Sequence, residues 1–338
     1  MTIHPAFCGH GIFTEFPGAL LERYDGWHPK AQAPGAGGAP AATPTDALIR
    51  ALRYMNVPNV WIYAFGRSGM INGAVTGPLV DALRKQKFNL AAWGYCSTKN
   101  IDAALQHADD IKKTYAIDAF IADVEPYNTG DDDWQNQDAA FDRLIDGLVQ
   151  RFGTDNLGIS IAPPWLKLDA KNDKKSLVTK HLVRRAANRI SVLAPQVYWM
   201  DYPKKTATLD QYGDTGLSEA DYPEHDPEAY ARMCIQCWRA AGIELPLIVS
   251  GQTYWSTGES TPTRPFMEAQ LAKFIATFSK WKPGDFVDRN VIGMNWYHAG
   301  QLDANGEGSM SDGMIEGIAA AHFDKLPYAA PTATVPVA

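Results

Sequence analysis

The feature that most constrains the fold is a regular alternation along the whole chain. Short runs rich in β-branched and aromatic residues are separated by longer segments with the three-to-four-residue periodicity of helices. The runs lie at residues 6–13, 60–65, 90–95, 119–125, 157–162, 190–200, 247–252 and 291–297. Strands that alternate with helices form parallel sheets. Eight such units in 338 residues predict an α/β fold, a single (β/α)8 TIM barrel that need not be regular.

The domain organisation follows from the same pattern. Residues 31–43, between the first strand and the first helix, are rich in Gly, Ala and Pro. We interpret them as a long surface loop within one barrel domain over residues 1–328. Residues 329–338 are rich in Ala, Pro, Thr and Val, and we predict a flexible tail there.

Charge and hydropathy exclude several classes of partner. The formal net charge of -7 and the pI of about 5.6 argue against nucleic acid or an anionic membrane as the main partner. No charged segment followed by an apolar run opens the chain, and no stretch approaches the roughly 18 apolar residues of a membrane span. We therefore expect synthesis in the cytoplasm without a signal peptide and no membrane insertion. The protein would act outside the cell only after lysis or delivery.

Neither the cysteines nor the histidines predict a metal site. Cys234 and Cys237 form a single C-x-x-C on a predicted helix, and no second pair follows, as a structural zinc site would need. The eight histidines show no H-x-x-x-H spacing. We therefore expect buried, inert thiols, no metal and no cofactor.

Two carboxylates close the fourth predicted strand, which is otherwise apolar. Asp123 and Glu125 face the same side because strand side chains alternate, and they lie roughly 7 Å apart along the strand. Their repulsion should raise one pKa and leave a protonated acid beside an ionised partner, the arrangement that glycoside hydrolysis needs. The alternative is a structural ion pair with a basic residue inside the barrel.

Other predicted strand ends bring polar and aromatic side chains to the same edge, where barrels of this type carry function. On the sixth strand Gln196 and Tyr198 share the face that we assign to the interior, and Asp201 lies just beyond. On the eighth, Trp296 offers the largest aromatic face for a sugar ring. Tyr198 and Trp296 could instead be core residues. The remaining candidates for substrate binding are Tyr63, Trp93, Tyr95, Gln252, Tyr254 and Tyr297.

These residues resemble the signature of family-18 chitinases, D-x-x-D-x-D-x-E. Asp118, Asp123 and Glu125 match its first, third and fourth members, whereas Ile121 replaces the second Asp. The resemblance implies that Glu125 is the general acid and that Asp123 orients the 2-acetamido group of the substrate, which itself attacks the anomeric carbon. It also implies counterparts on the sixth and eighth strands, namely Tyr198, Asp201 and Trp296.

The chain also resembles family-25 lysozymes, which carry D-x-E on the fourth strand and cleave peptidoglycan. The Asp that those enzymes have on their first strand is not found in residues 6–13. The P-Q-V-Y-W stretch at 195–199 is similar to one in bacterial and phage barrel proteins that look like these hydrolases.

We therefore expect a glycosidase of the muramidase or chitinase type that cleaves an N-acetylated amino sugar polymer, peptidoglycan or chitin. A carbohydrate-binding barrel with weak or no turnover is the alternative, and another barrel hydrolase or a lyase that uses Glu125 is a third. By analogy, the partners would be a polysaccharide and a phage or secretion apparatus.

The expected mechanism follows from the position of the carboxylates. Asp123 and Glu125 share a strand, so they cannot straddle a sugar ring. We therefore expect the acetamido oxygen of the substrate to attack, with Asp123 and Tyr198 holding it. The rival is direct displacement, in which Asp201 or another strand-end carboxylate activates water.

Overall fold

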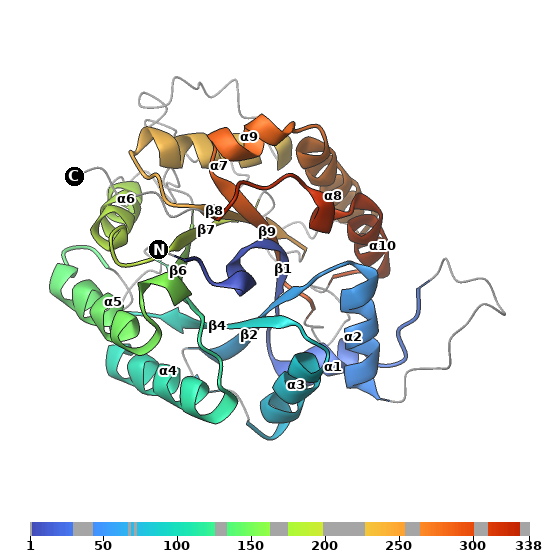
Figure 1. Ribbon diagram of the computed structural model, residues 1–338, viewed down its shortest axis with the longest axis horizontal. Coiled ribbons are helices and arrows are strands. Elements are labelled where there is room, and N and C mark those ends of the chain that lie inside the picture. Colours follow the sequence, from blue (N-terminus) through green and yellow to red (C-terminus); the bar gives the residue numbers. More distant parts are fainter. Residues whose placement is uncertain are drawn as a thin grey trace.

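The molecule is a closed parallel barrel surrounded by helices (Figure 1). The computed structural model describes residues 2–29, 43–66, 69–70, 73–125, 134–162, 175–198, 227–253, 264–300 and 310–331. Its parallel strands are β1 (Gly9–Phe13), β2 (Asn59–Gly66), β4 (Asn89–Cys96), β5 (Phe120–Val124), β6 (Leu157–Ile161), β7 (Val192–Val197), β8 (Leu247–Gln252) and β9 (Val291–Tyr297). Strand β1 pairs with β2 on one side and with β9 on the other, which closes the sheet. The TIM-barrel prediction is confirmed.

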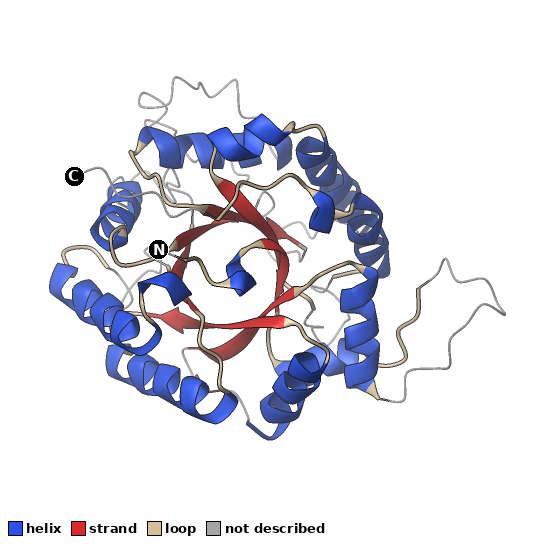
Figure 2. Cartoon of the chain, viewed as in Figure 1, coloured by secondary structure: helices blue, strands red, loops and turns tan. Residues whose placement is uncertain are grey.

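The helices form a ring outside the strands (Figure 2). They are α1 (Pro17–Tyr24), α2 (Pro44–Tyr54), α3 (Gly73–Lys85), α4 (Ile101–Tyr115), α5 (Asp138–Phe152), α6 (Lys175–Ala186), α7 (Pro227–Ala240), α8 (Arg264–Ser279), α9 (Pro283–Asp288) and α10 (Asp312–Ala321). Helix α2 begins directly after the loop expected at residues 31–43. The Thr43 side chain accepts a hydrogen bond from the Asp46 backbone, and Pro44 occupies the first turn. The two-residue β3 (Gly69–Met70) pairs antiparallel with the end of β2.

The first strand starts later than predicted because Pro5–Phe7 forms a 3-10 helix, η1. His4 caps this turn by accepting a hydrogen bond from the Ala6 backbone. The turn lies in the middle of the ring of strands (Figure 2). Inside the barrel, the Trp61 indole donates to the Ala6 carbonyl at 2.8 Å, and the Phe7 ring meets the edge of Trp61. The η1 turn and the Trp61 ring therefore fill part of the barrel interior at its amino-terminal end.

Three further expectations concern the ends and the cysteines. Residues 30–42, most of the expected Gly-rich loop, lie outside the described residues. The predicted tail begins too early at 329, because Ala329 is buried and its backbone N–H donates to Val291 at 2.9 Å. Cys234 and Cys237 are both buried in α7, and burial raises the pKa of the Cys234 thiol.

Two searches of the described residues bear on partners. No helix there is long and apolar enough to cross a membrane. No group of three or more His, Cys, Asp or Glu side chains in that part of the chain could hold a metal ion.

Candidate active site

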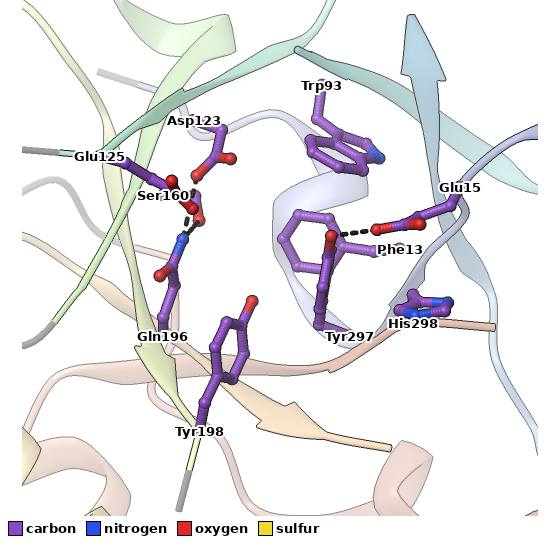
Figure 3. Close-up of a pocket in the computed structure, with 10 residues that line it drawn as sticks. All are labelled: Phe13, Glu15, Trp93, Asp123, Glu125, Ser160, Gln196, Tyr198, Tyr297 and His298. Atoms are coloured by element: carbon purple, nitrogen blue, oxygen red, sulfur yellow. Dashed lines mark hydrogen bonds between the residues drawn. The ribbon is translucent and has the colours of Figure 1, made fainter. Parts of the chain in front are cut away.

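A cavity of about 250 Å³ lies at the carboxyl ends of the strands (Figure 3). The described residues that line it are Phe13, Glu15, Trp93, Asp123, Glu125, Ser160, Gln196, Tyr198, Tyr297 and His298. They belong to β1, β4, β5, β6, β7 and β9 or follow these strands directly. This is the end of the barrel at which enzymes of this fold carry out their chemistry.

Asp123 is the most deeply buried carboxyl of the cavity, with 8% of its surface exposed. The Gln196 amide donates to Asp123 Oδ1 at 3.0 Å and lies 3.3 Å from Ser160 Oγ, which also hydrogen-bonds to Asp123. The three residues come from the neighbouring strands β5, β6 and β7. Burial raises the pKa of Asp123 well above its ordinary value, and the charge of Glu125 raises it further. The hydrogen bonds from Ser160 and Gln196 offset this only in part.

Glu125 lines the same wall but is only partly buried. It lies one residue beyond the end of β5, where the barrel opens. The sequence predicts that repulsion raises the pKa of one of the two carboxyls, and in the structure burial is the larger cause of the raised pKa of Asp123. No Lys or Arg occurs among the described lining residues, so they offer no support for a structural ion pair.

Glu15 lies across the cavity from Asp123 and Glu125 (Figure 3). The Tyr297 hydroxyl donates a hydrogen bond to Glu15 Oε1, and the Tyr297 ring stacks on Tyr198 at a centroid distance of 5.4 Å. Sequence reasoning missed Glu15, although it stands two residues beyond the first strand, at the edge that carries function. It also missed Ser160, a small polar residue within the otherwise apolar strand β6.

Thr14 fixes the position of Glu15. Its backbone N–H donates to the Trp61 carbonyl at 2.9 Å, its hydroxyl accepts from the Tyr63 backbone at 3.2 Å, and its carbonyl accepts from the Trp93 indole at 2.8 Å. Thr14 is fully buried, so these bonds are shielded from water. These bonds connect the turn after β1 to both β2 and β4. The backbone that carries Glu15 is therefore held in a fixed position.

The structure brings together only part of the predicted binding set. Trp93, Gln196, Tyr198 and Tyr297 line the cavity. Tyr95 and Gln252 are buried in the barrel and do not belong to the described lining. Asp201 and Tyr254 lie outside the described residues.

Tyr63 lies beside the cavity, with its ring centroid 4.5 Å from that of Trp93. Burial, with smaller contributions from Glu15 and Asp123, raises the pKa of Tyr63 to about 12. Its side chain is therefore a neutral phenol at physiological pH and can both donate and accept a hydrogen bond.

Trp296 was predicted to floor the cavity, and this prediction is wrong. Its side chain is fully buried on the outer face of β9, with ring centroids 5.6 Å from Phe274 and 5.0 Å from Phe323. Its indole N–H donates to His10 Nε2 at 2.7 Å. Neighbouring strand residues face opposite sides, so Tyr297, not Trp296, reaches the cavity.

Comparison with known proteins identifies the architecture. No family model and no curated protein matches the sequence. Among solved structures, fungal β-1,4-galactanases align over 92% of this chain and 98% of theirs, with a TM-score of 0.51 and 11% identity. A GH5_18 protein from Bifidobacterium longum subsp. infantis aligns over 93% of this chain and 78% of its own, with a TM-score of 0.51 and 10% identity. The chain is a (β/α)8 barrel. At such low identity the likeness establishes the fold alone and lends no support to family 18 or family 25.

Proposed function

We propose that the barrel is a glycosidase of the muramidase or chitinase type, which cleaves a polymer of N-acetylated amino sugars. The observation that carries this proposal is the Asp123–Glu125 pair on the wall of a cavity otherwise lined largely by aromatic rings. Aromatic faces suit the apolar faces of sugar rings, and paired carboxyls supply acid–base catalysis.

In this proposal Glu125 is the general acid. Two neighbouring carboxyls resist simultaneous ionisation, and burial and the charge of Glu125 raise the pKa of Asp123. In this proposal the pair holds one proton when the substrate binds. An acetamido N–H that hydrogen-bonds to Asp123 favours its charged form and leaves the shared proton on Glu125. Glu125 then delivers this proton to the glycosidic oxygen as the bond between that oxygen and the anomeric carbon breaks.

The substrate's own acetamido oxygen is the proposed nucleophile. Asp123 accepts from the acetamido N–H, and Tyr198 lines the same cavity with a phenol able to orient the group. The oxygen bonds to the anomeric carbon as the leaving sugar departs. Water then attacks that carbon, the acetamido oxygen leaves, and the water proton returns to Glu125.

Glu15 provides the rival mechanism. The preference for acetamido attack rested partly on the lack of a carboxylate facing the Asp123–Glu125 pair, and Glu15 faces it (Figure 3). In direct displacement, Glu15 would take a proton from water while that water attacks the anomeric carbon and Glu125 protonates the leaving oxygen. This mechanism does not need an acetamido group.

The test of the proposed function compares wild type with Glu125→Gln on purified peptidoglycan and on chitin oligosaccharides, with analysis of the ends released. We expect wild type to cleave one of them and Glu125→Gln to lose about three orders of magnitude in rate while keeping the fold. Glu244→Gln, an exposed carboxyl near the amino-terminal end of β8, is the matched control and should keep full activity.

Two outcomes would contradict the proposal. Near-full turnover by Glu125→Gln would show that another group is the acid. Sugar binding by wild type without any release of new ends would instead support the carbohydrate-binding barrel.

A further inference from the structure

An aromatic side chain is exposed at the rim of the cavity. Phe16 follows Glu15 directly, and 44% of its surface is accessible to solvent. Among the described residues only Phe266 and Val287 are other large apolar side chains exposed to a similar degree. Phe16 is the N-cap residue of α1 and makes no side-chain capping bond. Ser, Thr, Asn or Asp would stabilise the helix there, so the start of α1 does not explain a phenylalanine.

Phe16 continues a line of rings that begins inside the cavity. The Phe16 and Tyr63 centroids lie 5.2 Å apart with the rings edge to face, and Tyr63 lies 4.5 Å from Trp93. Trp93 lines the cavity (Figure 3). We call Phe16, Tyr63 and Trp93 the aromatic track. It leads from the cavity that contains Asp123 and Glu125 to the surface of the barrel.

The aromatic track is held in place before any ligand binds. Thr14, which anchors the turn carrying Phe16, also hydrogen-bonds to the Tyr63 backbone and to the Trp93 indole. A Cβ atom at Gly66 would lie 2.0 Å from the Tyr63 hydroxyl, so a larger residue there would displace the phenol from its present position. Trp93, whose indole is hydrogen-bonded, and Tyr63, which packs against it, therefore lose little conformational entropy when a ligand binds.

The size of the cavity indicates what the track binds. A volume of about 250 Å³ is below the range of about 300–1,000 Å³ typical of sites for drug-sized ligands. Only a short part of a polymer can therefore lie inside, and the adjoining units must run over the rim. Of the described rim, the side with Phe16 and Tyr63 offers apolar ring surface next to a phenol hydroxyl.

We propose that the aromatic track is a binding subsite for the sugar units next to the one in the cavity, so that the barrel selects long polysaccharide chains over short ones. The inference rests on the proposed function, because it takes the cavity as the place where a sugar is held. Phe16 supplies an exposed ring for stacking, and Tyr63 supplies both ring and hydroxyl.

Binding measurements on chains of different length test the subsite. All variants carry Glu125→Gln to block hydrolysis, and calorimetry measures the binding of a disaccharide, a tetrasaccharide and a hexasaccharide. Both chitin oligosaccharides and peptide-free peptidoglycan strands serve as probes. We expect affinity to rise with length in the parent. Phe16→Ala should weaken hexasaccharide binding by about 2- to 12-fold and leave disaccharide binding unchanged.

Matched variants separate stacking from other effects. Phe16→Trp should keep the length dependence, and Phe16→Leu, which keeps apolar bulk without a ring, should lose it. Phe16→Ser should lose it while melting no lower than the parent, because serine caps α1. Val287→Ala, at an exposed position in the helix that precedes β9, should change nothing.

The possible results distinguish failure of the proposed subsite from failure of the proposed function. Equal affinities of Phe16→Ala and the parent at every length would overturn the subsite and leave the proposed function intact. If neither kind of oligosaccharide bound to the parent at any length, both would be overturned.

Discussion

At the scale of single residues, Glu15 decides between the two mechanisms. It is partly exposed in the cavity, and its charge contributes to the raised pKa values of Asp123 and Tyr297. Its Oε1 accepts a hydrogen bond from the Tyr297 hydroxyl, and the Tyr297 ring stacks on the ring of Tyr198. Glu15 can therefore act in two ways: as a base for water, or as the group that orients Tyr297.

Substituting Glu15 by glutamine separates these roles. A glutamine oxygen can still accept from Tyr297, so with acetamido attack we expect Glu15→Gln to keep activity within about tenfold of wild type. Loss of a general base would cost about 10²- to 10⁴-fold. Rate measurements on the acetylated polymer and its de-acetylated form provide the check. A loss of that larger size, together with cleavage of the de-acetylated polymer, would establish direct displacement.

At the scale of elements, β9 shows how far strand alternation can be used. The sequence predicts the bounds of this strand, residues 291–297, which the structure reproduces. The face was assigned from the size of the Trp296 ring, although size does not distinguish a sugar platform from a packing residue. Gly293, Asn295 and Tyr297 face the interior of the barrel. Trp296 faces the other way and packs between the barrel and the helices. A period of two fixes which residues share a side but not which side is inside.

The two neighbours on β9 should therefore respond in opposite ways. Trp296→Ala leaves a cavity against Phe274 and removes a partner of His10, so we expect a loss of about 3–5 kcal/mol in the free energy of unfolding. Sugar affinity of the folded protein should not change. Tyr297→Phe keeps the ring and loses only the bond to Glu15, so activity should fall more than stability. Urea unfolding and binding isotherms on both variants measure this, and weakened binding by a fully stable Trp296→Ala would contradict the assignment.

At the scale of the whole molecule, the barrel was predictable because each of its eight parallel strands carries a local signal. Helices α1, α9 and α10 carry weaker signals in the sequence: α1 has no polar cap, α9 is short, and α10 contains Gly313 and Gly317. The Asp123–Glu125 wall could be predicted since both residues lie at a strand end. Glu15 and Ser160 could not, because their importance comes from residues distant in sequence that the closed barrel brings beside them.

A buried histidine lies on the strand that closes the barrel. His10 lies on β1, the strand that joins the two ends of the sheet. Its Nε2 accepts from the Trp296 indole at 2.7 Å, and its Nδ1 lies 3.0 Å from the Asn56 carbonyl. An indole N–H can only donate, so Nδ1 carries the proton and donates to Asn56. Both hydrogen bonds can form only while the imidazole is neutral, because a protonated Nε2 could not accept from the indole.

Acid should therefore weaken the closed barrel. Burial lowers the pKa of His10 from 6.5 to about 4. The unfolded chain binds a proton at His10 below pH 6.5, but the folded chain does not until about pH 4, so stability falls as the pH drops through this range and then levels. The shift corresponds to roughly 3 kcal/mol. His10→Gln should be less stable than wild type at neutral pH. On acidification its free energy of unfolding should fall by about 3 kcal/mol less than that of wild type. Urea unfolding of both proteins between neutral pH and about pH 4 measures the difference. Parallel losses in the two proteins would show that protonation of His10 does not cause the loss of stability in acid.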